Sequence, residues 1–186
     1  MALEVRSPAF TGEMVSRVLD MASSVVSRAV LFSCRAEGFF GIGQSGVEIE
    51  GANADEVARS LVIPADTMSI LRDASETRAT ARQTLRKEGG DALLVAELGG
   101  RTPSQGLAAP IVVNNRVMVV LYGDNLPEDR PIGSILELEL LMIQAGMSVE
   151  NNLLQKRLQH YETLSEGQGD SGGEADSEAP VEGGSR

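Results

Sequence analysis

The clearest pattern of hydrophobic and polar positions lies between Gly106 and Asn125, where two apolar, β-branched runs flank Asn114 and Asn115. A two-residue loop of residues that tolerate positive φ is a strong signal for a β-hairpin. Because side chains alternate between the faces of a strand, both faces of this hairpin come out apolar. Such a hairpin belongs in a sheet that is covered on both sides. The chain must therefore supply two layers of cover.

The register of this hairpin follows from its loop. In a regular ladder Val112 faces Val117 and Ile111 faces Met118. The expected faces are Leu107, Ala109, Ile111, Met118, Val120 and Tyr122 on one side, and Ala108, Pro110, Val112, Val117, Val119 and Leu121 on the other.

A first helix is predicted from about Pro8 to Ser27, with Ser7 or Thr11 as its N-cap. Its apolar residues recur at steps of four, four, three and four, a narrow stripe that fits a helix-to-helix seam or packing on its own sheet. The stripe consists of Phe10, Met14, Val18, Met21 and Val25. A strand over Ala29–Arg35 and its hairpin partner over Gly38–Gln44 follow.

Gly41 to Gly46 spells G-x-G-x-x-G, the pattern of a dinucleotide-binding turn. That turn has to open a helix whose N-terminus holds the pyrophosphate. The residues after Gly46, Val-Glu-Ile-Glu-Gly, do not start a helix. We therefore interpret these glycines as bending an edge strand.

The middle of the chain reads as short helices. Asn53 caps a helix over Ala54–Leu61, Asp66 caps another over Thr67–Ala74, and Asp91 caps a third that ends at Leu98.

The segment Thr77–Leu85 is open between helix and strand. As a helix it would stack Arg78, Arg82 and Arg86 on one face, either for an anionic ligand or, more commonly, as a solvated face.

The last helix is predicted from Ile135 to about Leu164, which is roughly 45 Å long at 1.5 Å per residue. Its first half is expected to cover the sheet, and its second half needs another apolar surface. Its recurring stripe consists of Leu136, Leu140, Ile143, Met147, Leu154, Leu158 and Tyr161. A stripe that extends beyond its own core is most simply buried on a second copy.

The composition excludes several classes of function. One cysteine and one histidine leave no internal disulfide and no ordinary zinc site, so we expect no metal. A net charge of −11 without a basic surface argues against nucleic acid. The start of the chain does not resemble a signal peptide, and no apolar run is long enough to span a membrane, so a cytoplasmic location is expected.

Two parts are predicted along the chain. Residues 1–164 form one domain that includes the long helix. Residues 165–186 are acidic and glycine-rich and carry one branched aliphatic residue, Val181, so this tail is expected to be disordered.

The order of elements resembles that of GAF domains. The likeness is carried by LAAPIVVNNRVMVVLYGDN, then a proline-containing loop, then SILELELLMIQAGMSVENNLLQKRL. The resemblance implies an α+β fold in which an antiparallel sheet carries the terminal helices on one face. Short helices and loops on the other face would enclose a small-molecule pocket.

The chemistries known in GAF domains each lack a required part here. The cyclic-nucleotide motif is absent, Cys34 lies inside a strand, and His160 lies near the end of the terminal helix. A single cysteine cannot both attack and resolve, as sulfoxide reduction requires. We therefore expect no cofactor and no catalytic residues.

Two functions remain open. The first is a non-catalytic bacterial signalling module that dimerises through its terminal helices and contacts another signalling protein. Its interface would comprise Met14, Val18, Met21, Val25, Leu140, Ile143, Met147, Leu154, Leu158 and Tyr161. The second is a sensor of a small anionic metabolite or nucleotide, with pocket candidates Arg78, Arg82, Arg101 and Tyr122.

Overall fold

The computed structural model describes residues 11–167, with side chains as far as residue 160. The chain divides into two compact units, residues 1–151 and residues 152–186. The described part of the first unit holds the sheet, four short helices and the beginning of the terminal helix. The described part of the second unit is the remainder of that helix. The predicted tail lies outside the described residues beyond Gly167, so its disorder and the boundary at residue 164 stay predictions.

One antiparallel sheet forms the centre of the first unit. Its strand order is β3-β2-β1-β6-β5-β4. The strands are β1 (Arg28–Cys34), β2 (Gly38–Ser45), β3 (Val62–Pro64), β4 (Ala81–Gln83), β5 (Gly106–Val113) and β6 (Arg116–Asp124). The predicted first hairpin is confirmed within one residue at its ends. The segment Thr77–Leu85, which the sequence left undecided between helix and strand, contains edge strand β4. Arg78, Arg82 and Arg86 therefore do not share a helix face.

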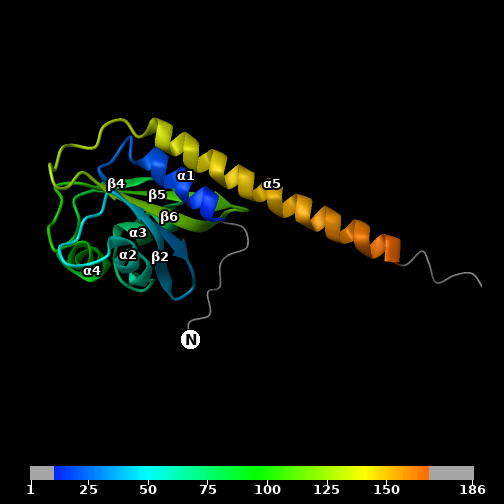
Figure 1. Cartoon of the computed structure of the whole chain (residues 1–186), viewed down its shortest axis with the longest axis horizontal. Coiled ribbons are helices and arrows are strands. Elements are labelled where there is room, and N and C mark those ends of the chain that lie inside the picture. Colours follow the sequence, from blue (N-terminus) through cyan, green and yellow to red (C-terminus); the bar gives the residue numbers. More distant parts are fainter. Residues whose placement is uncertain (1–10, 168–186) are drawn as a thin grey trace, which may run out of the picture. The chain divides into compact units, whose positions relative to one another are not determined.

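Helices cover both sides of this sheet. They are α1 (Gly12–Ala22), α2 (Ala54–Ser60), α3 (Ile70–Thr77), α4 (Gly89–Glu97) and α5 (Leu136–Gly167). Within the first unit, α1 and the beginning of α5 lie on one side, and α2, α3 and α4 lie on the other (Figure 1). The expected α+β class and its two layers of cover are confirmed.

Local capping explains where the short helices begin. The side chain of Thr11 accepts the Met14 amide at the start of α1, and Asn53 caps α2 as predicted. Ser69 caps α3, so the prediction of Asp66 as cap was wrong. Helix α4 begins at Gly89, so the prediction of Asp91 as its cap was wrong; the buried Asp91 carboxylate accepts the Ile70 amide of α3 instead.

Helix α1 is shorter than predicted. It ends at Ala22 rather than Ser27, and the Ser23 and Ser24 hydroxyls donate to the Asp20 and Met21 carbonyls. Serine side chains that bond to nearby carbonyls compete with helix continuation.

The central hairpin has the predicted loop but not the predicted register throughout. Asn114 and Asn115 have φ of 49° and 61°, which a two-residue hairpin loop requires. Val112 pairs with Val117, but Ile111 then pairs with Val119, so Met118 forms a bulge.

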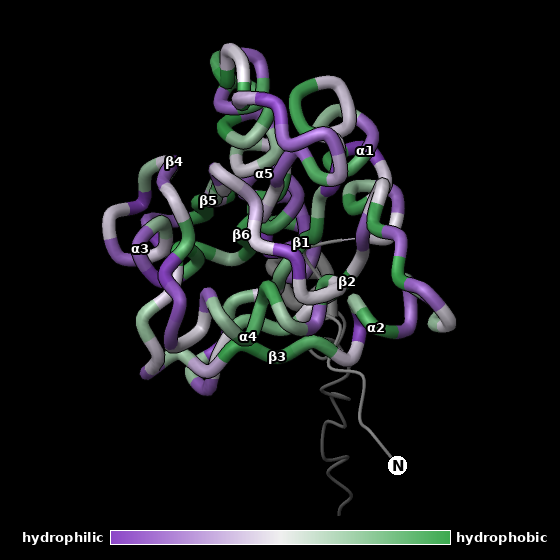
Figure 2. Tube along the Cα trace, turned by 90° about the vertical axis from the view of Figure 1, so that its left-hand side faces the viewer, coloured by the Kyte–Doolittle hydropathy of each residue, from purple (hydrophilic) through white to green (hydrophobic). Residues whose placement is uncertain are grey.

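The bulge exchanges the faces of β6 beyond that point. Val119 and Leu121 join Ile111 on one face, while Val120 and Tyr122 join Ala108 on the other. Both faces are nevertheless buried along most of the hairpin, as predicted. In Figure 2 the central strands carry much of the hydrophobic colour, whereas α3 is mostly hydrophilic.

The glycines of the G-x-G-x-x-G pattern serve close packing. A Cβ on Gly41 would lie 1.7 Å from the Ala58 carbonyl oxygen of α2, and one on Gly43 would lie 2.9 Å from the Val15 side chain of α1. Strand β2 pairs with both β1 and β3, so the prediction of an edge strand was wrong. No helix opens at Gly46, which agrees with the rejection of a dinucleotide site.

Helix α5 packs closely on the sheet at Gly146. A Cβ added there would lie 2.4 Å from the Val112 carbonyl oxygen of β5. Among the described residues, no helix has the length and apolar character needed to cross a bilayer.

We predict that Gly146→Ala destabilises the domain by about 1–3 kcal/mol, because the methyl group overpacks a helix–sheet contact made by backbone atoms. That cost exceeds the roughly 1 kcal/mol that alanine gains over glycine in a helix. Urea unfolding measures the difference. Gly133→Ala is the control, since a Cβ there meets open space, and its effect should stay within about 0.5 kcal/mol. Equal stability of both variants would contradict the close approach.

Candidate functional site

The face of the sheet where the resemblance implies a ligand pocket is filled by the chain's own side chains. Phe32, Ile63 and Tyr122 are among the largest buried residues there, each no more than 1% exposed. They pack with apolar residues of α2, α3 and α4, including Ala58, Leu71 and Leu94. Because these side chains are closely packed, this face of the sheet is a structural core.

A buried ion pair closes one end of this core. Arg28 and Asp124 lie directly opposite each other on β1 and β6. The Arg28 guanidinium donates to both Asp124 carboxylate oxygens at 2.8 and 2.7 Å, and its remaining terminal nitrogen donates to the Leu98 carbonyl. The Asp124 carboxylate also accepts the Tyr122 hydroxyl at 2.7 Å and the Leu126 amide. Every strong donor in this group has its acceptor inside the protein.

Tyr122 therefore does not belong to a ligand pocket, contrary to its place among the sequence candidates. Burial, together with the adjacent Asp124 carboxylate, holds the pKa of the Tyr122 phenol well above its ordinary value. The neutral hydroxyl acts as a permanent donor to Asp124.

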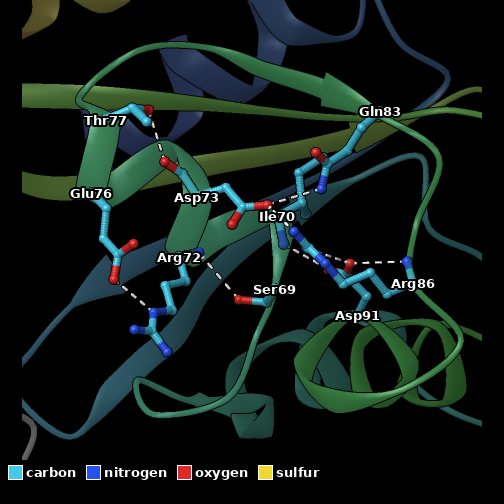
Figure 3. Close-up of polar contacts among 9 residues, drawn as sticks. All are labelled: Ser69, Ile70, Arg72, Asp73, Glu76, Thr77, Gln83, Arg86 and Asp91. Carbon is cyan, nitrogen blue, oxygen red and sulfur yellow. Dashed lines mark hydrogen bonds and ion pairs between the residues drawn. The ribbon is translucent and has the colours of Figure 1, made fainter.

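A second polar cluster joins α3, the segment after β4, and α4 (Figure 3). The Asp91 carboxylate, fully buried, accepts the Ile70 amide at 2.7 Å and both the amide and the guanidinium of Arg86. Arg86 also donates to Asp73 at 2.6 Å, and that contact is the main reason the pKa of Arg86 is raised. Gln83 donates to the same Asp73 oxygen. The cluster is an internal clamp rather than an open binding site.

The sequence reasoning missed both polar groups. The signal for the first group was a charged residue at one end of each of two apolar strands, Arg28 before AVLF and Asp124 after VVLYG. A charge in such a position is buried only when it finds a partner.

The three arginine candidates do not come together. Arg82 donates to the Gln105 side chain and to the Gly133 carbonyl, so it holds two loops in place. Arg101 is exposed in the loop after α4. Arg78 is exposed at the left-handed C-cap of α3, with φ of 54°, and lines a groove.

This groove, of about 350 Å³, lies between β5 and α5. Its apolar wall includes Pro110 and Val112 from β5 and Met142 from α5, and Arg78 and Thr80 form part of its rim. Four further residues of α5 line it: Glu139, Ile143, Met147 and Glu150. The Glu150 carboxylate also accepts the Asn114 amide of the hairpin loop.

Helix α5 carries two apolar stripes in the first unit. Leu138, Met142, Ala145 and Val149 are buried. Leu136, Leu140, Ile143 and Met147 are 61, 51, 60 and 59% exposed. Both stripes follow steps of four, three and four, and the 3.6-residue period puts them on opposite sides of the helix. One stripe covers the sheet, and the other, which we call the outer stripe, faces solvent.

The remaining predicted interface residues differ in their exposure. Val18 is 2% exposed and packs inside its own domain, so it is not available to a partner. Met21 is 44% exposed, and Met14 and Val25 are half-buried. In the second unit, Leu154 and Leu158 are exposed and continue the helical spacing of the outer stripe. The side chain of Tyr161 lies outside the described residues.

Reactive groups are sparse in the described part of the chain. Within residues 11–160, no three His, Cys, Asp or Glu side chains are placed to hold a metal ion. Burial raises the pKa of the Cys34 thiol to about 12, which keeps it in the unreactive protonated form at neutral pH.

Comparison with known proteins identifies the fold. No protein-family model matches the sequence, and no curated protein matches it. The GAF domain/HD domain protein from Geobacter sulfurreducens superposes with a TM-score of 0.60 at 17% identity, covering 80% of this chain and 99% of that one. The second GAF domain of DevS from Mycobacterium smegmatis gives 0.56 at 16% identity, with 82% and 98% covered. The GAF domain of a two-component sensor histidine kinase from Bacillus halodurans gives 0.52 at 16%, with 79% and 99% covered.

These similarities extend over nearly the whole of each GAF domain. The chain therefore has the GAF fold, as the resemblance of its C-terminal third implied.

We predict that Tyr122 ionises only when the domain unfolds. Its raised pKa means that the unfolded chain loses this proton near pH 10 while the folded chain retains it. The contribution to stability is therefore complete below pH 10 and decreases as the pH rises above it. Wild type should show more phenolate absorbance at 295 nm than Tyr122→Phe only at pH values where circular dichroism shows that the domain has unfolded. A Tyr122 transition near pH 10 in folded protein would refute the buried hydrogen bond to Asp124.

Proposed function

We propose that this chain is a non-catalytic signalling and protein-interaction module that forms a homodimer through its terminal helices. The outer stripe of α5 is the single observation that carries the proposal. Its four residues in the first unit are more than half exposed, although the opposite side of the same helix is fully packed. Exposed apolar residues at regular spacing mark an interaction surface.

The stripe has the form of a helix-to-helix contact. Steps of four and three residues place apolar side chains along one narrow line, which suits knobs-into-holes packing against another helix. Removing a half-exposed leucine or methionine side chain from water contributes about 1 kcal/mol. Leu154 and Leu158 extend the same spacing, so several such contributions add along one helix.

A second copy of the chain is the simplest partner, because a two-fold dimer covers the same surface on both subunits. The proposed interface has the outer stripe at its centre, with Met21 beside it and Met14 and Val25 at the margin. Tyr161 remains a candidate from its position in sequence. Another signalling protein would contact the dimer rather than replace it.

The filled core also supports an interaction role. A domain whose interior is occupied by Phe32, Ile63 and Tyr122 has no need of a ligand for stability. The similar structures include GAF domains of a sensor histidine kinase and of an HD domain protein. These are the settings in which we place this chain.

Ile143→Asp combined with Met147→Asp should convert the dimer into a monomer at about 10 μM, because two carboxylates per subunit would be buried without partners. Light scattering after size exclusion measures the mass. Since both residues are about 60% exposed, the thermal midpoint of the monomer should change little. Asn152→Asp is the control, because Asn152 is exposed on α5 away from the stripe and its flanks, so the dimer should stay intact. A wild-type monomer at this concentration, unaffected by either variant, would rule the dimer out.

A small-ligand sensor is the alternative, and the groove beside Arg78 favours it. Its volume of about 350 Å³ falls at the lower end of the range typical for small-molecule sites, roughly 300–1,000 Å³. Arg78 supplies the positive charge that an anionic group needs.

If this alternative holds, a nucleotide or organic acid at a hundredfold excess over its dissociation constant stabilises the fold by about 2.7 kcal/mol. A thermal-shift screen would detect the compound, and Arg78→Ala should abolish the shift while Arg101→Ala retains it. A screen without any shift, or a shift indifferent to Arg78, would remove this groove from consideration.

A further inference from the structure

We infer that the two α5 helices of the dimer run antiparallel, with the two-fold axis near Met147. The inference rests on the proposed dimer and adds the direction of its helices and the residues that set it. Its basis is the distribution of charge beside the outer stripe.

One flank of the stripe is acidic at its N-terminal end and basic at its C-terminal end. Glu139 and Arg157 are 18 residues apart, which is five turns of an α-helix, so they lie on the same flank. Glu150, 11 residues after Glu139, lies close to that line. Glu139 and Glu150 are half-buried beside the groove, and Arg157 is exposed.

The opposite flank carries one charge, Glu137 near its N-terminal end, and amide side chains beyond it. Gln144, Asn151 and Gln155 lie there, roughly 100–160° further round the helix from the three charged residues. The two flanks therefore offer different partners to a second helix.

Symmetry decides which flanks meet. In a parallel pair each flank faces the opposite flank of the partner, whereas in an antiparallel pair like flanks face each other. Within residues 136–160, a parallel pair would put Glu139 near the partner's Glu137, and Glu150 and Arg157 against amide side chains. An antiparallel pair puts the acidic end of the charged flank against the basic end of the partner's. Charge complementarity therefore favours the antiparallel pair.

The apolar residues fit the same arrangement. With the axis at Met147, Leu136 lies level with the partner's Leu158 and Leu140 with the partner's Leu154. Met147 meets the partner's Met147, and only Ile143 faces a polar residue, the partner's Asn151. The seam from residue 136 to residue 158 is about 33 Å long.

The register that matches the apolar residues of the two helices also matches their charges. In this register Glu139 lies within two residues, or about 3 Å along the axis, of the level of the partner's Arg157. The two-fold axis creates this ion pair twice. A parallel pair in register instead brings Glu139 close to the level of the partner's Glu137 on the facing flank, where like charges beside an apolar seam repel.

The arrangement has a consequence for signalling. The C-terminal half of α5 is occupied by the N-terminal half of the partner's α5. The C-terminal ends of the two α5 helices then lie at opposite ends of the seam, which would suit one signalling protein at each end rather than one continuous parallel stalk.

Disulfide trapping tests the direction of the helices. In a Cys34→Ala background, Leu140→Cys, Met147→Cys and Leu154→Cys are made singly and oxidised, and cross-linked dimer is measured on non-reducing gels. We expect Met147→Cys to cross-link with itself. Leu140→Cys should not, because its two copies are about 21 Å apart along the seam, beyond the reach of about 7 Å between Cα atoms. A mixture of Leu140→Cys and Leu154→Cys proteins should cross-link.

The outcomes separate the two proposals. Cross-linking of Leu140→Cys with itself would show a parallel dimer and overturn the antiparallel inference while leaving the proposed function intact. Cross-linking at Met147 alone, with none in the mixture, would likewise reject this register. A monomeric mass and no cross-link in any variant would remove the dimer itself.

Exchange of charges gives a second readout. Arg157→Glu should weaken association about tenfold at low salt, because it replaces two ion pairs with two repulsions. Glu139→Arg added to Arg157→Glu should restore affinity, since it recreates the pairs in reverse. If the double variant associates no better than the single one, these two residues do not face each other and the inference fails.

Discussion

The structure depends on burying a hairpin that is apolar on both sides. Strands β5 and β6 expose almost no side chain to water on either face, and each face takes its own layer of helices. Since apolar burial is the main favourable term in folding, the position of every other element follows from covering these two strands. Helix α5 also has two apolar sides, of which one packs on the sheet and the other is exposed.

The polar groups of the first unit serve this burial instead of opposing it. Arg28 and Asp124 end their apolar strands with opposite charges, and the antiparallel register of β1 and β6 brings them face to face. Asp91 satisfies the first amide of α3 and also pairs with Arg86. Removing one member of such a pair leaves an uncompensated buried charge, which typically costs about 3–5 kcal/mol. The charged residues of these two polar clusters therefore hold the elements of the fold together.

A GAF fold with a filled core differs in kind from a ligand-binding one. The interior that could accept a small molecule is packed by Phe32, Tyr122 and their neighbours, and most of the exposed large hydrophobic residues lie on α1 and α5. In the proposed dimer, the outer stripe and the charged flank of α5 would specify both the partner and its direction.

Much of the fold could be predicted from the sequence, because its signals act over a few residues. Asn114 and Asn115 accept positive φ and set the hairpin, Asn53 caps α2, and apolar spacing marks α5. Only the tertiary structure decided the bulge at Met118, the choice of Ser69 as a cap and the pairing of Arg28 with Asp124. It also decided which stripe of α5 is buried, since Leu138, Met142, Ala145 and Val149 take the sheet although the stripe of Leu136, Leu140, Ile143 and Met147 is equally apolar. Local conformation is determined by neighbouring residues, but the choice between equivalent partners depends on groups far apart in the chain that meet only when the layers pack.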